Sequence, residues 1–532
     1  MIPVRKFIRI CHEQAGILKI ADSSGKELTG RKILMGAFVF RHFLRRTVFS
    51  ADEKFIGVLL PPNVITTIIN AALALDKRVA VNLNYTVSNE IMNQCIKTAG
   101  IKHIITSRKV LDKLNYHDLD AELVILEDVV PNISKGDKIK GALEAYSPCW
   151  FVDWLLGLKD ISPDDLLTVI FTSGSTGVPK GVMLSHDNIG SNIDMFMNLE
   201  RIGWPDSLIG VLPTFHAFGF IVNIWVVLTT KVRAVYHHSP LEPKAIGKLT
   251  KKYQCSVIVA TPTFYRMYIR KCDPEDMKSI EIAVAGGEHM PIDVMDAFEA
   301  KFGARPLEGF GATECSPVVS ANILERRRVH ADEILRKDGS IGLPVPGVMV
   351  EIRDIDDEKT VLGANEVGMM WVRGRNVMKG YLNMPEKTAE VLKDGWYKTG
   401  DLARIDEDGF IFITGRLSRF SKIGGEMVPH EGIEKAIGDI IGVNPDEPLS
   451  VIVSAVPSEK KGEKIIVMYT DLKGKTPEEI VVAMRENNIP PIWIPALDAF
   501  VQVEKIPILG TGKLDIQGAK NLALKVMNPD EE

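Results

Sequence analysis

The side chains best suited to chemistry lie in the segment 172–181, TSGSTGVPKG. This segment holds three glycines, four small hydroxyl residues, one proline and one lysine. A glycine-rich turn exposes backbone N–H groups, because glycine has no side chain and adopts positive φ readily. With the hydroxyls and Lys180 added, such a turn suits a polyphosphate, and a flexible surface turn is the alternative. No GxxxxGK[ST] sequence occurs in the chain, so this is not a Walker A loop.

Activation of a carboxylate by ATP requires further groups, because the charge that develops at the α-phosphate must meet preorganised donors. Glu314, in EGFGATE, offers a hard oxygen ligand for Mg²⁺, and Thr176 can add a hydroxyl. Asp401, in WYKTGD, offers a charged acceptor to the two ribose hydroxyls. Phe310 offers a ring face for adenine, beside the glycine pair 286–287. Taken singly, such residues also fit an ordinary turn or a helix cap.

Eight stretches of the chain, in the same order, resemble the adenylate-forming superfamily, which includes acyl-CoA synthetases, luciferases and the adenylation domains of peptide synthetases. The resemblance implies an enzyme, a ligase that forms acyl-AMP and then a carbon–sulfur bond. It implies ATP and Mg²⁺ as cofactors, with CoA or the phosphopantetheine of acyl-carrier protein as the thiol. The stretches are TSGSTGVPKG, LPTFHAFGF, AVAGGE, EGFGATE, SIGLPVPG, WYKTGDLARIDEDGF, GRLSRFSKIGGEMV and PILGTGK.

The resemblance also implies roles for individual residues. Glu314 and Thr176 are the implied Mg²⁺ ligands, and His216 lies at the entrance of the acyl pocket. Lys513 is the lysine that contacts the carboxylate and the α-phosphate during adenylation. The implied nucleotide-binding residues are Thr172, Ser173, Gly174, Ser175, Thr176, Gly177 and Lys180 at the phosphates, Gly286, Gly287, Glu288 and Phe310 around adenine, Asp401 and Arg416 at the ribose, and in addition Gly311, Thr313 and Lys422.

Without the resemblance, Lys513 would be a solvated lysine and His216, between two phenylalanines, a core histidine. The resemblance places Lys513 in a mobile C-terminal domain. One orientation brings Lys513 to the ATP, and the other presents the turn 424–425 to a pantetheine thiol. Two positions depart from the family pattern: Phe310 replaces the usual tyrosine, and Arg419 replaces the commonest hinge residue, an aspartate.

Within the superfamily, VNLNYT (81–86), EGFGATECSP and RFSKIGGEMV resemble one branch in particular. This branch is the acyl–acyl-carrier-protein synthetase half of bifunctional 2-acylglycerophosphoethanolamine acyltransferases. It implies a fatty acid substrate and acyl-carrier protein as the acceptor, with fatty acyl-CoA synthesis as the alternative. We expect the apolar segment 215–228, with Phe264, Val318 and Val319, to line the acyl pocket. A non-catalytic acyl-adenylate or nucleotide-binding sensor is a distant alternative, which intact Lys513 disfavours.

The elements that position these residues follow from the apolar pattern. From Phe55 onward, short apolar runs alternate with helix-length segments, which predicts βαβ units and a largely parallel sheet. The run 166–171 is predicted to be a buried strand, and 182–192 to begin a helix. We therefore predict an α/β fold. Its predicted parts are an AMP-binding N-terminal domain over 1–415, which includes a β-rich subdomain at about 340–415, and a small mobile α+β C-terminal domain over 416–532.

The composition fits a globular protein of more than one domain, with 532 residues, 45% of them hydrophobic and 25% charged. The net charge of −5 gives no sign of a nucleic-acid surface, so no nucleic-acid partner is expected. The six cysteines are scattered, without CxxC or zinc spacing. The chain shows no secretory signal peptide and no apolar stretch long enough to span a bilayer, so we expect a cytoplasmic protein.

One segment, ALEAYSPCWFVDWLLGL (142–158), places Trp150, Phe151 and Trp154 close together. It fits an amphipathic helix that packs on the core, and it also fits a surface that meets lipid or an acyl chain. Peripheral contact with the inner membrane face therefore stays open.

Overall fold

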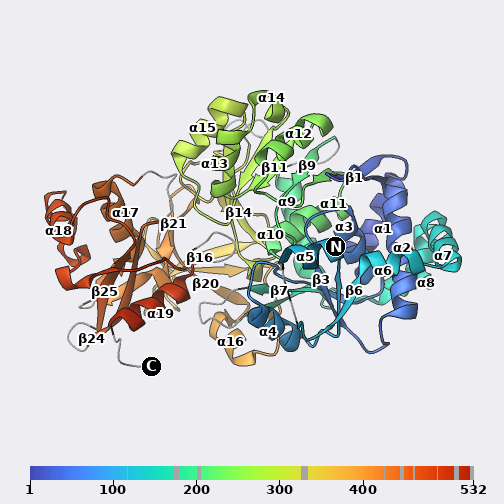
Figure 1. Cartoon of the computed structure of the whole chain (residues 1–532), viewed down its shortest axis with the longest axis horizontal. Coiled ribbons are helices and arrows are strands. Elements are labelled where there is room, and N and C mark those ends of the chain that lie inside the picture. Colours follow the sequence, from blue (N-terminus) through green and yellow to red (C-terminus); the bar gives the residue numbers. More distant parts are fainter. Residues whose placement is uncertain are drawn as a thin grey trace.

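The computed structural model describes most of the chain and groups its strands into four sheets. Two sheets belong to the N-terminal part, and the two others follow residue 340. Figure 1 shows the last of the four, in orange and red, at one end of the molecule. The described residues are 1–114, 116, 118–172, 179–200, 205–324, 334–423, 426–443, 449–458, 462–487, 489–508 and 514–527.

The first sheet has nine strands, and its central strands run parallel, as the alternating pattern predicts. Antiparallel strands close both edges. In spatial order the strands are β15 (Leu343–Pro344), β14 (Val318–Ala321), β13 (Pro306–Gly311), β12 (Ile282–Ala285), β11 (Val257–Ala260), β9 (Ser207–Gly210), β10 (Arg233–Tyr236), β1 (Leu18–Asp22) and β2 (Glu27–Thr29).

The second sheet has seven strands, and it holds the hairpin on which the phosphate loop stands. In spatial order the strands are β18 (Gly380–Tyr381), β8 (Lys180–Ser185), β7 (Leu166–Thr172), β4 (Val79–Asn82), β3 (Phe55–Leu59), β5 (His103–Thr106) and β6 (Glu122–Ile125). The prediction of a buried strand over 166–171 is confirmed. The prediction of a helix from residue 182 is wrong at its start, because β8 first pairs antiparallel with β7 and α9 begins only at His186 (His186–Glu200).

Helices fill the space between the two sheets and cover their outer faces. Eleven of the twelve residues of α3 (Val64–Leu75) are buried, and this helix contacts β1 and β4, one strand from each sheet. The others are α1 (Pro3–Glu13), α2 (Gly30–Thr47), α4 (Asn89–Ala99), α5 (Arg108–Leu114), α6 (Leu126–Val129), α7 (Lys135–Tyr146), α8 (Cys149–Leu155), α10 (Ala217–Phe220), a π-helical turn (Ile221–Val226), α11 (Val227–Thr229), α12 (Pro243–Tyr253), α13 (Pro262–Lys271), α14 (Pro274–Met277) and α15 (Ile292–Phe302).

Two smaller sheets follow along the chain, the first ending at Arg416 and the second beginning at Phe420, so the predicted 415/416 boundary falls one residue before the end of the first sheet. The first contains β16 (Met349–Arg353), β17 (Gly368–Arg373), β20 (Trp396–Ile405), β19 (Leu392–Lys393) and β21 (Ile411–Arg416), with α16 (Pro385–Val391) beside it. The second contains β23 (Glu426–Pro429), β22 (Phe420–Ile423), β25 (Gly462–Tyr469), β24 (Val451–Ser458) and β26 (Phe500–Gln502), and it is covered by α17 (His430–Ile441), α18 (Pro477–Glu486) and α19 (Ile516–Met527).

All six cysteines are free thiols, and five of them are buried. Within the described ranges, no helix combines the length and the apolar character needed to cross a bilayer.

Candidate functional site

The hairpin β7–β8 holds the two ends of the phosphate loop. Thr172 ends β7 and Lys180 begins β8, and the two residues are paired across the hairpin. The residues between them, 173–178, lie outside the described ranges, so Ser173, Gly174, Ser175, Thr176 and Gly177 remain predictions. The ammonium nitrogen Nζ of Lys180 lies 5.1 Å from the centre of the Tyr381 ring, on the neighbouring strand β18.

Tyr381 connects this hairpin to the predicted Mg²⁺ ligand. Its hydroxyl donates a hydrogen bond to Oε1 of Glu314, at 2.8 Å. Burial and the nearby Glu314 carboxylate both raise the pKa of Tyr381, which keeps the phenol protonated and able to donate. The backbone carbonyl of Glu314 accepts a hydrogen bond from the N–H of Met378, at 2.8 Å, so the chain leading to Tyr381 is fastened to the same turn. Glu314 is therefore held through its backbone and its side chain.

The two residues predicted at the ribose face each other in neighbouring strands. Asp401 in β20 is paired with Arg416 in β21, and Oδ1 of Asp401 lies 3.5 Å from Nε of Arg416. Burial raises the pKa of Asp401 to about 6, the negative charges of Glu314 and Glu431 add to this rise, and Arg416 opposes it. Burial and two nearby negative charges disfavour the ionised form of Asp401. Such a carboxylate fits a site in which a bound cation or hydroxyl donors complete its surroundings.

The residues predicted around adenine gather at the ends of β12 and β13, which are adjacent parallel strands. Gly286 follows β12, and a Cβ atom at this position would lie 3.0 Å from Cε1 of Phe218. Gly287 has a positive φ of 87°, and Oε2 of Glu288 accepts a hydrogen bond from the Thr263 hydroxyl, at 3.1 Å. Phe310 is partly buried in β13, near the end of that strand.

Gly311 and Thr313 continue from Phe310 into the turn that carries Glu314. A Cβ atom on Gly311 would lie 2.5 Å from the carbonyl oxygen of Pro317, so the backbone closes tightly at this point and requires glycine. Thr313 begins the short 3₁₀ turn that contains Glu314. Phe310, of the candidate adenine residues, and the candidate metal ligand Glu314 therefore belong to one continuous segment.

His216 lies at the N-terminal end of α10, with its ring centre 4.5 Å from that of Phe215. It is partly buried, and both its role at the entrance of the acyl pocket and the alternative of a core histidine stay predictions. The rest of the segment 215–228 corrects our expectation of a long acyl lining. Only His216 and Phe218 in this segment retain exposure, because the other side chains fill the core between the two sheets. Phe264 and Val318 are partly buried, and Val319 is buried.

Several predicted residues cannot be placed. Lys513 and the turn 424–425 lie outside the described part of the chain, as does the side chain of Lys422. Conversely, sequence reasoning missed Tyr381, whose segment we had not linked to any chemistry. It also missed Glu431, at the start of α17, which belongs to a different domain from Asp401. No spacing rule could identify either residue, since both join the site through the tertiary structure.

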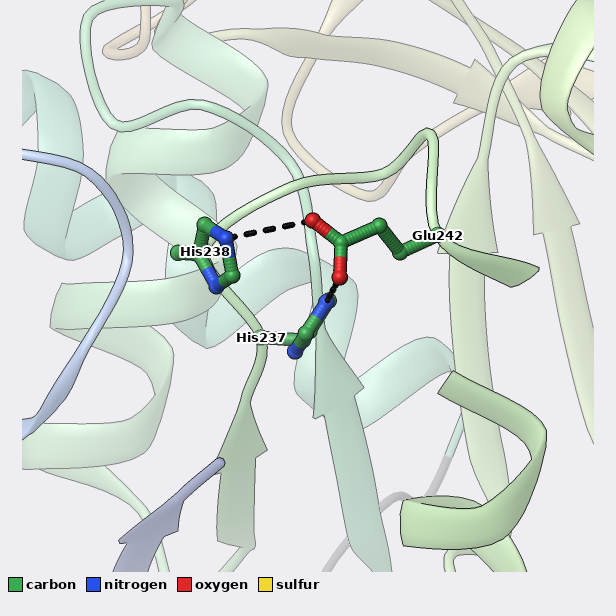
Figure 2. A group of neighbouring side chains, drawn as sticks. All are labelled: His237, His238 and Glu242. Atoms are coloured by element: carbon green, nitrogen blue, oxygen red, sulfur yellow. Dashed lines mark hydrogen bonds and ion pairs between the residues drawn. The ribbon is translucent and has the colours of Figure 1, made fainter. Parts of the chain in front are cut away.

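A further pair of histidines meets one carboxylate after β10 (Figure 2). Nε2 of His237 and Nε2 of His238 each lie 3.2 Å from a different oxygen of Glu242. The ligand atoms are close enough together for one metal ion. However, Nδ1 of His237 is buried and has no hydrogen-bond partner among the described residues. Metal-bound histidines usually donate the opposite N–H to an acceptor, so the arrangement fits polar contacts that fix this loop better than a metal site.

Known proteins resemble the chain in both sequence and structure. Residues 13–382 match the model of the AMP-binding enzyme family. A long-chain-fatty-acid–CoA ligase of Bacillus subtilis (strain 168) is 26% identical over 519 residues, which cover 92% of this chain and 89% of that protein. A long-chain-fatty-acid–CoA ligase of Yersinia pestis is 33% identical over 334 residues, which cover 61% of this chain and 56% of that protein.

Solved structures share the fold over almost the whole length. ATP-bound MatB from Rhodopseudomonas palustris aligns with a TM-score of 0.77 at 24% identity, covering 99% of both chains. The o-succinylbenzoate CoA synthetase MenE of Bacillus subtilis, in complex with its acyl-adenylate intermediate, aligns with a TM-score of 0.78 at 19% identity, covering 97% of this chain and 98% of that chain. At these identities the likeness shows the fold, and it confirms the α/β architecture predicted from the sequence.

Proposed function

The chain belongs to the AMP-binding enzyme family, and from this premise we propose that it activates a fatty acid with ATP and transfers the acyl group to the thiol of CoA. One observation carries the proposal. Tyr381 contacts both Lys180, at the end of the phosphate loop, and Glu314, the carboxylate that we propose binds Mg²⁺. This pairing suits a Mg²⁺-bound triphosphate.

In the proposed first step, a carboxylate oxygen of the fatty acid attacks the α-phosphorus of ATP and pyrophosphate leaves, which gives acyl-AMP. Lys180 and the N–H groups of the phosphate loop neutralise the departing phosphates. Glu314 and Thr176 would hold Mg²⁺, which supplies further charge neutralisation when bound. Asp401 accepts hydrogen bonds from the ribose, and Lys513 stabilises the charge at the α-phosphate.

In the proposed second step, the acceptor thiol loses its proton, its sulfur attacks the acyl carbon and AMP leaves.

The segment 417–420 links the two domains, and we propose that the C-terminal domain turns about it between the two steps. Phe420, at the start of β22, packs with Leu417 on the cluster around Trp371. Arg419, between them, donates hydrogen bonds to Glu434 of α17 and to the carbonyl of Val453. We propose that rotation occurs in this link, and that Arg419 moves with the C-terminal domain.

The acceptor is the point at which sequence and relatives disagree. The segments VNLNYT and RFSKIGGEMV favour acyl-carrier protein, which is our second candidate. Full-length similarity to a protein named as a long-chain-fatty-acid–CoA ligase favours CoA. We therefore propose CoA as the main acceptor. A long-chain fatty acid partitions into bilayers, so peripheral membrane contact fits this substrate class.

The experiment that tests this proposal measures the two half-reactions separately. Purified protein, ATP, Mg²⁺ and fatty acids from short to long chain length are assayed for pyrophosphate release. CoA and holo-acyl-carrier protein are then compared as acceptors at equal concentration. We expect pyrophosphate release with a fatty acid and faster thioester formation with CoA. Faster transfer to the carrier protein would establish the second candidate, and absence of pyrophosphate release with every acid would contradict both.

A further inference from the structure

We propose that the outward surface of α7 and α8 docks on an anionic lipid bilayer. Large apolar side chains are exposed along this surface, and no other described segment of similar length carries as many. We name it the α7–α8 face. Its members, with their exposed fractions, are Ile139 (61%), Leu143 (66%) and Tyr146 (70%) of α7, and Trp150 (67%), Trp154 (66%) and Leu155 (46%) of α8.

The spacing of these residues makes the face continuous. Ile139, Leu143 and Tyr146 are separated by four and three residues, which places them on one side of α7. Trp150 and Trp154 are four residues apart on α8, and only Ser147 and Pro148 separate the two helices. Figure 1 shows α7 and α8 outside α2, at the end of the molecule opposite the C-terminal domain. The face is therefore an outer surface of the molecule.

Every carboxylate of α7 and α8 points away from this surface. Asp137, Glu144 and Asp153 are all buried, and each pairs with a basic side chain of α1 or α2. α7 also approaches α2 closely, since a Cβ atom on Gly141 would lie 2.9 Å from the backbone nitrogen of Val39. The pairs are Asp137 with Arg46 at 2.7 Å, Glu144 with His42 at 2.9 Å, and Asp153 with Arg5 at 2.9 Å.

The charged side chains that α7 exposes are cationic: Lys135, Lys138 and Lys140. After α8, the exposed Lys159 is followed by the exposed Asp160, so the excess of positive charge lies on α7. The guanidinium of Arg31 lies 4.5 Å from the ring centre of Tyr146. Apolar and aromatic side chains bordered by lysines are typical of helices that lie in a membrane interface, where tryptophan and tyrosine sit at headgroup level.

This charge pattern selects among the possible occupants. A second copy of the chain would bring the same lysines against one another, which opposes self-association through this face. Both helices are too short to span a bilayer, so the expected mode is contact with the surface. An anionic surface satisfies the lysines and covers the aromatic side chains together. That such docking serves uptake of the substrate rests on the proposed fatty-acid specificity, whereas the docking itself does not.

The test is sedimentation of the full chain with vesicles of phosphatidylcholine, with and without added phosphatidylglycerol. We expect binding to the anionic vesicles that weakens as salt is added. Trp150→Ser/Trp154→Ser should reduce the bound fraction at least tenfold, and Lys138→Glu/Lys140→Glu should abolish the preference for phosphatidylglycerol. Val361→Ser/Val482→Ser, which removes two other exposed apolar side chains, should bind as the unmodified chain does.

Pyrophosphate release with a short-chain fatty acid, in the absence of vesicles, separates this inference from the proposed function. The face lies outside the candidate site, so all three double variants should retain that activity. Equal vesicle binding by the tryptophan variant, or no binding of the unmodified chain to anionic vesicles, would overturn the inference. So would self-association of the unmodified chain that the tryptophan variant abolishes, because the occupant would then be a second copy.

Discussion

Tyr381 donates its hydroxyl hydrogen to Glu314 at a distance of 2.8 Å, and the two residues are 67 positions apart in the chain. The phenol ring also faces the ammonium group of Lys180. One side chain therefore joins the phosphate-loop hairpin to the carboxylate proposed to bind Mg²⁺, and it fixes where that carboxylate points.

Tyr381→Phe keeps the ring beside Lys180 and removes only the hydroxyl, which donates to Glu314 and also forms a hydrogen bond with Tyr397. A hydrogen bond to a charged group contributes about 1.5–3 kcal/mol, so we expect acyl-AMP formation to fall roughly 10- to 100-fold. Pyrophosphate release, measured at increasing Mg²⁺ concentration, checks this. Because Mg²⁺ should bind more weakly, the half-maximal rate should require more Mg²⁺. Tyr469→Phe, in the C-terminal sheet, is the matched control. An unchanged Mg²⁺ response in Tyr381→Phe would show that Glu314 does not need this donor.

Asp401→Asn should stabilise the ligand-free protein while it weakens nucleotide binding. The pKa of Asp401 is raised from 3.8 to about 6, so the folded state holds this proton more tightly than the unfolded state does. The stabilising contribution of the protonated carboxyl is complete below pH 3.8 and is lost as the pH rises through 6. Because asparagine carries no charge, the variant should gain roughly 1–3 kcal/mol at pH 8 and much less near pH 4.

Urea unfolding at several pH values measures this difference, and ATP titration at pH 8 measures the loss of binding. Asp120→Asn, at an exposed position, provides the control and should leave both quantities unchanged. If Asp401→Asn destabilised the protein equally at pH 4 and pH 8, packing rather than charge would account for its effect.

Lys513→Ala should slow adenylation by roughly two orders of magnitude or more, about 3 kcal/mol of transition-state stabilisation. Thioester formation from supplied acyl-AMP should be largely preserved, because the proposed second orientation withdraws Lys513 from the site. Lys505→Ala, an exposed lysine of the same domain, is the control. A parallel loss of both half-reactions would contradict the proposed change of orientation.

Gly219→Ala should destabilise the fold at the turn that carries His216. A Cβ atom at position 219 would lie 2.1 Å from the carbonyl oxygen of Pro213, so the backbone of the turn must shift. We expect a loss of about 1–3 kcal/mol in the free energy of unfolding. Gly438→Ala, inside α17, should instead raise the free energy of unfolding by up to about 1 kcal/mol. The atom nearest to the added Cβ would be Cβ of Val443, 4.0 Å away. Urea unfolding of both variants checks the pair.

The sequence by itself determined the fold class and the composition of the phosphate loop. Apolar periodicity is a local property, so the strand before the loop and the parallel sheets could be predicted from it. The same local reasoning failed after the loop. There the run from residue 182 fits a helix in isolation, but the neighbouring strands β7 and β18 make it a strand.

Only the tertiary structure decided how the candidate site is assembled. Tyr381 reaches Glu314 because β18 pairs with β8, and the spacing of residues along the chain does not predict this pairing. The raised pKa of Asp401 depends on its burial and on carboxylates from two other segments. The outward side of α7 was likewise open until the pairing of Asp137 and Glu144 with α2 fixed it. Pattern specifies which side chains can act, whereas their distances and their desolvation arise only when distant segments pack together.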